Sequence, residues 1–155
     1  MSTSFTFLRH AQTEANEKGV FSGSLDLPLS KEGEACAEKT AEKLEGEHFD
    51  AVFYGTAKRV LQTTDYVLSK LRDTPKIILK SEQIKETDFG LFEGLSAAEA
   101  QQKYPQEWQR YMQDWQTFVF PQGDGVEAYY ERCGQFIHDI LFEYENNRIL
   151  IIAHK

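Results

Sequence analysis

Histidine and arginine side chains directly follow two short apolar runs of the sequence. Arg9 and His10 come after the run at residues 5–8, and His154 comes after the run at residues 148–153. An imidazole can act as a nucleophile or carry a proton, and a guanidinium binds the oxygens of an anion in a bidentate manner. Each histidine alone is equally compatible with a cap or surface role, but together these side chains are suited to chemistry on an anionic group.

A second arginine and a group of acids follow two further apolar runs. Arg59 stands in the first turn of a predicted helix, where the macrodipole disfavours a cation, so a ligand-facing role is favoured. The loop at residues 84–95 holds two glycines and three acids, including Glu86 and Asp88, which alone indicate only turn chemistry. Two of the four histidines and two arginines, all beside predicted strand ends, are hard to ascribe to coincidence.

The elements that position these residues follow from the apolar periodicity. Four short apolar runs predict strands, at residues 5–8, 51–54, 76–80 and 148–153. Their apolarity is continuous rather than alternating, which is typical of strands buried on both faces of a parallel sheet. Amphipathic stripes and capping signals predict helices at residues 30–44, 60–71, 96–104 and 126–144.

This alternation predicts an α/β fold, a three-layer α/β/α sandwich with a mostly parallel central sheet, formed by one domain over residues 1–155. In such a sheet, ligands bind beyond the carboxyl ends of the strands. The aromatic-rich residues 108–121 allow two interpretations: a helix packed over the sheet, which we favour, or an insertion that covers a site. The sequence ends directly after its most apolar run, so we expect either a longer natural protein or another cover for that strand.

Composition and charge narrow the classes of partner. The net charge of −8 argues against nucleic-acid binding through the whole surface, and an anionic substrate would need a local arginine cluster. No run approaches the ~20 apolar residues of a membrane span, and the N-terminus has no signal-peptide pattern, so we expect a cytoplasmic protein without a membrane partner. Cys36 and Cys133 lie far apart and outside any CxxC pattern, so we expect ordinary small thiols.

Taken in order, these motifs resemble the histidine phosphatase superfamily, also called phosphoglycerate mutase-like. The matching segments are Arg9-His10-Ala11 for its Arg-His-Gly motif, residues 21–33 for its following loop, residues 55–63 for Ser-Pro-x-x-Arg-x-x-Gln-Thr, residues 86–94 for Glu-x-x-x-Gly-x-x-Glu-Gly, and Ala153-His154 for its last histidine. The resemblance covers essentially the whole chain and implies the same three-layer fold, normally with further structure after the last histidine.

The resemblance also implies roles for individual residues. It implies metal-independent phosphoryl transfer, without a cofactor, on a small-molecule phosphomonoester. His10 is implied as the nucleophile that carries the phosphoryl group, and Glu86 as the acid that protonates the leaving oxygen. The side chains implied to hold the non-bridging oxygens are Arg9, Arg59 and His154. Secondary substrate contacts are implied for Asn16, Ser22 and Gly23. The oligomeric state stays open.

Within the superfamily, one segment is similar to the Gly-Glu-Gly-plus-Arg spacing of alpha-ribazole phosphatases, which act in cobalamin nucleotide-loop assembly. It comprises residues 121–125 and Arg132, with Asp124 in place of the glutamate. The resemblance therefore favours alpha-ribazole 5'-phosphate as substrate. A phosphoglycerate mutase or a broad sugar-phosphate phosphatase is the alternative, although the chain lacks the long insertions of classical mutases.

Two other functional classes remain as alternatives. An inactive member of the superfamily would bind phosphorylated ligands without turnover, but all five implied catalytic residues are present. A zinc hydrolase would use His10, His154 and a nearby carboxylate, Glu86 or Asp88, as ligands. Neighbouring arginines would repel the bound cation, so this interpretation is disfavoured. Ala11, in place of glycine, keeps a small side chain beside His10.

Overall fold

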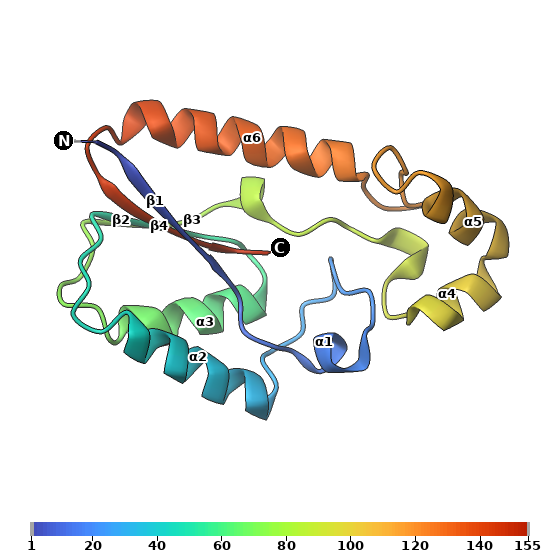
Figure 1. The fold of residues 1–155 in the computed structure, drawn as a ribbon, viewed down its shortest axis with the longest axis horizontal. Helices are drawn as coiled ribbons and strands as arrows, with labels where there is room; N and C mark the ends of the chain where they lie inside the picture. The colour runs from blue at the N-terminus through green and yellow to red at the C-terminus, as the bar shows by residue number, and fades with distance from the viewer. Residues whose placement is uncertain (1, 155) are drawn as a thin grey trace.

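A parallel four-stranded sheet forms the centre of the computed structural model, which describes residues 2–154 (Figure 1). Its strands are β1 (Ser4–Arg9), β2 (Ala51–Tyr54), β3 (Ile77–Lys80) and β4 (Arg148–Ala153). The order across the sheet is β1-β4-β2-β3, and each neighbouring pair is parallel. The α/β class and the parallel sheet predicted from the sequence are therefore confirmed.

Helices cover both faces of this sheet and make the three predicted layers. The α-helices of the described chain are α1 (Glu14–Lys18), α2 (Lys31–Lys43), α3 (Lys58–Leu68), α4 (Ala97–Lys103), α5 (Pro105–Gln113) and α6 (Val126–Glu143), with 3-10 turns η1 (Glu82–Ile84) and η2 (Gly90–Phe92). On one face, α2 and α3 pack against Val52, Leu150 and Ile152. On the other, Phe136 of α6 packs against Phe53. Within residues 2–154, no helix has the length and apolarity needed to span a bilayer.

The strands differ in burial because of their place in the sheet. In β4, which lies between β1 and β2, residues Ile149, Leu150, Ile151 and Ile152 are all buried, as continuous apolarity predicts. In β1, at the sheet edge, Phe7 is 66% exposed. The prediction that the run at residues 5–8 is buried on both faces is therefore wrong for this edge strand.

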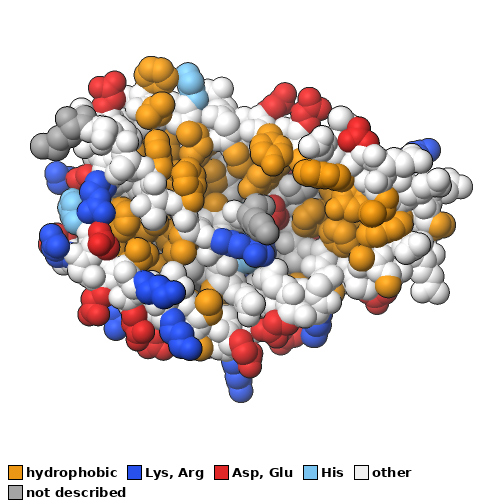
Figure 2. All heavy atoms as spheres, in the orientation of Figure 1, with side chains coloured by type: hydrophobic (Ala, Val, Ile, Leu, Met, Phe, Trp, Pro, Cys, Tyr) orange, Lys and Arg blue, Asp and Glu red, His pale blue; other side chains and the backbone are white. Residues whose placement is uncertain are grey.

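The aromatic-rich region forms a second core away from the sheet. Phe92 and Phe120 are fully buried there, and the other members of the cluster are Phe21, Phe89, Leu91, Leu95, Ala100, Tyr104, Trp108, Tyr111 and Phe118. Figure 1 places α4 and α5 beyond the end of the sheet, and Figure 2 shows a hydrophobic patch at that end of the molecule. The favoured interpretation of residues 108–121, a helix packed over the sheet, is wrong, because these aromatic rings bury one another instead.

The start of α2 is packed directly against the loop that carries His10. Ser30 caps the helix as predicted, accepting a hydrogen bond from the Gly33 backbone nitrogen at 3.1 Å. A Cβ on Gly33 would lie 1.9 Å from the carbonyl oxygen of Gln12. Only glycine permits this approach, so the cap of α2 fixes the backbone two residues after His10.

Candidate active site

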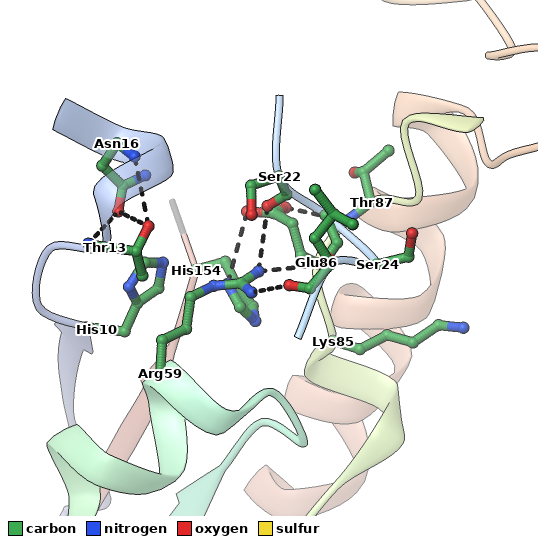
Figure 3. A network of polar contacts seen from close by, with 12 residues as sticks. His10, Thr13, Asn16, Ser22, Ser24, Arg59, Lys85, Glu86, Thr87 and His154 are labelled. Carbon is green, nitrogen blue, oxygen red and sulfur yellow. Dashed lines mark hydrogen bonds and ion pairs between the residues drawn. The ribbon is translucent and has the colours of Figure 1, made fainter. Parts of the chain in front are cut away.

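The structure gathers four of the predicted catalytic residues, His10, Arg59, Glu86 and His154, at the carboxyl edge of the sheet (Figure 3). His10 follows β1 and His154 follows β4, and these strands pair with Arg9 opposite Ala153. Arg59 lies in the first turn of α3, directly after β2, and Glu86 follows η1 after β3. Parallel strands present their carboxyl ends at one edge, so loops far apart in sequence converge there.

His10 is held in one tautomer by the backbone of the next residue, Ala11. Its imidazole is buried, and Nδ1 lies 2.7 Å from the carbonyl oxygen of Ala11. A carbonyl oxygen only accepts, so Nδ1 carries the proton and Nε2 keeps its lone pair. Thr63 supports this arrangement, because its hydroxyl oxygen accepts the Ala11 N–H at 3.0 Å. The result is an oriented imidazole whose Nε2 has a free lone pair.

The surroundings keep this imidazole uncharged. Burial lowers the pKa of His10 to about 4, against the raising effect of the Ala11 hydrogen bond. The positive charges of Arg59 and Arg9 lower that pKa further. His10 is therefore neutral at pH 7, as a nucleophile must be.

His154 presents two buried ring nitrogens without a hydrogen-bond partner in the described part of the chain. Its ring lies edge to face with that of His10, with centroids 5.1 Å apart. Burial, followed by the charges of Arg59, His10 and the other arginines, holds its pKa well below the ordinary value. Buried polar atoms are rarely left unpaired. These nitrogens therefore mark the place where a polar group of a ligand would bind.

Arg59 is the largest fully buried side chain of the described residues, at 1% exposure. Its terminal nitrogens donate to the carbonyl oxygens of Leu25 at 2.9 Å, Gly23 at 3.1 Å and Ser22 at 3.2 Å. Burial lowers the pKa of Arg59, and the opposing acids are Glu86, Asp26 and Glu93. Arg59 thus lies within the site, as predicted, and also fixes the loop at residues 22–25.

Glu86 has the environment of a proton donor. Burial raises the pKa of its carboxyl group, while the Thr87 N–H bond at 3.0 Å and the charges of Arg59, Arg9 and Arg132 oppose that rise. Its Oε2 lies 3.6 Å from Nδ1 of His154, just beyond hydrogen-bond distance. A carboxyl group with a raised pKa, facing the second histidine, can give a proton to a leaving oxygen.

Two cavities flank these side chains. One, of about 220 Å³, lies on the Glu86 side and is lined by Gly23, Ser24, Asp26, Thr56, Ala57, Lys85, Glu86 and Asp88. The other, of about 450 Å³, lies on the His10 side, and its lining includes Arg9, His10, Gln12, Asn16 and Thr63. Arg9 is exposed at the end of β1 and lines this second cavity together with His10.

The residues predicted to make secondary substrate contacts differ in their hydrogen bonds. Asn16 accepts the Thr13 N–H at 3.0 Å and closes the capping box of α1, a helix that the sequence did not predict. The Gly23 N–H donates to Glu93 at 2.9 Å, while the Ser22 hydroxyl oxygen is buried without a partner among the described residues. Their contact with a substrate stays a prediction.

Two residues near the site were not predicted to act there. Glu93 accepts hydrogen bonds from the loop at residues 23–24. The sequence pattern that could have identified it is the Glu-Gly that closes the segment at residues 86–94. Arg132 donates to the carbonyl oxygens of Gln83 at 2.8 Å and Lys85 at 2.9 Å, directly before Glu86.

In residues 2–154, no three histidine, cysteine or acidic side chains lie together as a metal site would require.

Neutral imidazoles, arginines and a carboxyl acid at the edge of a parallel sheet are suited to chemistry on a phosphate group. The family model of the histidine phosphatase superfamily (branch 1) matches residues 5–155. The chain belongs to the histidine phosphatase superfamily, as its motifs indicated.

Relatives and solved structures agree with this family. The chain is 32% identical over 149 residues to a 2,3-bisphosphoglycerate-dependent phosphoglycerate mutase of Cytophaga hutchinsonii, covering 95% of this chain and 70% of the relative. It is 26% identical over 147 residues to phosphoserine phosphatase 1 of Hydrogenobacter thermophilus, covering 95% and 68%. The alpha-ribazole phosphatase structure from Shigella flexneri superimposes with a TM-score of 0.88 at 29% identity, covering 97% of this chain and 73% of that one. The fold and family predicted from the sequence are confirmed, and the chain is an enzyme of this phosphatase and mutase superfamily.

Proposed function

We propose that this chain hydrolyses a small phosphomonoester through a phosphohistidine intermediate on His10. The observation that carries the proposal is the hydrogen bond of His10 Nδ1 to the Ala11 carbonyl oxygen at 2.7 Å. This bond leaves the lone pair on Nε2, and the lowered pKa of His10 keeps that pair unprotonated at pH 7. The imidazole is thus ready to attack without a separate base.

In the first step, Nε2 of His10 attacks phosphorus, and the bond from phosphorus to the leaving oxygen breaks. Arg9, Arg59 and His154 hold the three non-bridging oxygens, whose charge is concentrated in the transition state. Glu86 gives its proton to the leaving oxygen, and the free alcohol departs. The carboxylate of Glu86 then takes a proton from a water molecule, while the oxygen of that water attacks the phosphorus atom of the phosphohistidine. This second step releases inorganic phosphate and restores both groups.

The substrate we propose is alpha-ribazole 5'-phosphate. Two solved structures that resemble this chain support it: the Shigella flexneri alpha-ribazole phosphatase, and an Escherichia coli protein described as a candidate alpha-ribazole-5'-P phosphatase. The similarity to a phosphoglycerate mutase at 32% identity favours a second candidate, phosphoryl transfer between phosphoglycerates.

The experiment is a phosphatase assay on p-nitrophenyl phosphate with chelator present, comparing the chain with His10→Ala. We expect metal-independent turnover that the substitution abolishes, together with an acid-labile, base-stable phosphoryl label on the unaltered protein. Alpha-ribazole 5'-phosphate, phosphoserine and 3-phosphoglycerate with a phosphoryl donor are then compared by kcat/KM. Unchanged turnover in His10→Ala would contradict the proposal, and absence of turnover in the unaltered chain would favour a phospho-ligand binding module.

A further inference from the structure

Every hydrogen bond that the Glu93 carboxylate accepts within the described chain comes from a backbone N–H group near the site. Oε1 accepts the N–H of Gly23 at 2.9 Å, of Ser24 at 2.8 Å and of Phe89 at 3.0 Å. Oε2 lies 3.1 Å from the same Gly23 nitrogen. Glu93 therefore joins two loops, one at residues 23–24 and one that begins directly after Glu86. Hydrogen bonds to an ionised carboxylate are about twice as strong as neutral ones.

Arg59 holds the same loop from its other side. Glu93 takes the N–H groups of residues 23 and 24, while the guanidinium of Arg59 takes the carbonyl oxygens of Ser22, Gly23 and Leu25. Both charged groups thereby bind one short stretch of backbone, and the guanidinium keeps further N–H groups for a ligand. The loop is fixed between a buried cation and a half-buried anion, and it has little freedom to shift.

This loop lies in direct contact with the backbone next to Glu86. A Cβ on Gly23 would lie 1.7 Å from the carbonyl oxygen of Thr87. The N–H of Thr87 in turn donates to Oε1 of Glu86 at 3.0 Å. Gly23, Ser24 and Glu86 also line the same 220 Å³ cavity. The position of the Glu86 carboxyl group therefore depends on where Glu93 holds the loop.

We propose that Glu93 is a positioning residue for the proton donor Glu86. The inference rests on the proposed phosphohistidine mechanism, in which Glu86 protonates the leaving oxygen. Glu93 acts through the backbone of the loop and does not contact the substrate. Its loss would displace the acid while His10, held by its bond to Ala11, keeps its orientation.

The test compares substrates that differ in their need for a proton. p-Nitrophenolate leaves without protonation, whereas the alkoxide of glycerol 2-phosphate requires an acid. For Glu93→Ala we expect kcat/KM, which reports only the step that transfers the phosphoryl group to His10, to fall ~100-fold with glycerol 2-phosphate and much less with p-nitrophenyl phosphate. Glu93→Gln, which keeps one acceptor oxygen, should recover part of the loss. The matched control is Glu99→Ala, because Glu99 also accepts a backbone N–H, that of Ser96 at 2.8 Å, but at the start of α4.

An equal loss of kcat/KM on both substrates would overturn the inference and indicate a general structural role. If Glu93→Ala does not fold, judged by circular dichroism and urea unfolding, the same substrate comparison on Glu93→Gln decides the question. Full activity of Glu93→Ala on both substrates would also overturn it. Failure of the proposed function is seen separately, as turnover by the unaltered chain that persists in His10→Ala or is absent altogether.

Discussion

The imidazole rings of His10 and His154 lie edge to face, with centroids 5.1 Å apart, and both are held neutral. Two imidazolium ions at this separation would repel each other strongly in a buried site. The same burial that suppresses their charge leaves the lone pair of His10 free for attack. The pH–rate profile and the pH dependence of the free energy of unfolding should therefore both reflect the lowered pKa values of these histidines.

The pH–rate profile should be displaced toward acid. His10 must be neutral to attack, and its pKa of about 4 places the acidic limb of kcat/KM near that value instead of near 6.5. Glu86 must be protonated in the first step, so kcat/KM for an alkyl phosphate should fall as pH rises through its raised pKa. The measurement is kcat/KM from pH 3.5 to pH 9, and Glu86→Gln should lose the alkaline limb. An acidic limb near pH 6.5 would contradict the assigned environment of His10.

The stability of the fold should decrease on mild acidification. The pKa of His10 in the folded chain lies below its ordinary value, so the unfolded chain binds the proton more readily. The contribution is present above pH 6.5 and is lost as pH falls from 6.5 toward about 4. Urea unfolding should show a loss of about 3 kcal/mol from this group over that range. In His10→Asn, the difference between pH 7 and pH 4.5 should shrink by a similar amount, and an unchanged difference would refute the prediction.

Removal of the buried guanidinium should reduce both stability and activity. In Arg59→Met, the carbonyl oxygens of Ser22, Gly23 and Leu25 lose their donor, and Glu86 loses its neighbouring cation. We expect a loss of about 3–5 kcal/mol in the free energy of unfolding, and a ~100-fold lower kcat/KM. Arg110→Met, at an exposed position of α5, is the matched control and should stay within about 0.5 kcal/mol of the unaltered chain. Equal effects of the two substitutions on urea unfolding would show that the Arg59 contacts contribute little.

Adding one methyl group at each of two glycines should distinguish the effect of tight packing at the site on stability from the effect of helix propensity. In Gly23→Ala, the new Cβ would meet the Thr87 carbonyl oxygen, so the loop must move and the free energy of unfolding should fall by about 1–3 kcal/mol. Gly134 lies exposed within α6, and nothing lies within 4 Å of a Cβ there. Gly134→Ala should therefore stabilise the fold by about 0.5–1 kcal/mol. Thermal unfolding of both variants measures the contrast, which fails if both shift in the same direction.

Periodicity and strand-end reasoning predicted much of this molecule because both depend on local sequence. The apolar stripe at residues 126–144 became α6, and Ser30 caps α2 as its position indicated. The meeting of His10, His154 and Arg59 followed from a general property of parallel sheets.

What the sequence did not predict depends on partners far along the chain. The carbonyl oxygens that Arg59 binds lie 34 to 37 residues before it, and no local pattern marks an arginine for backbone contacts. α1 was missed because five residues are too few to show a helical period. The aromatic cluster was misplaced because periodicity identifies an apolar face but not the surface against which it packs.

The sheet order also determines when the site can come into existence during synthesis. β4 lies between β1 and β2, although it follows both by nearly a hundred residues or more. Until the ribosome has made residues 148–153, the first two strands have no ladder between them, and the loops that carry His10 and Arg59 lack the strand that lies between them. The nascent protein must therefore keep two apolar strands apart and unaggregated while it waits for their common neighbour.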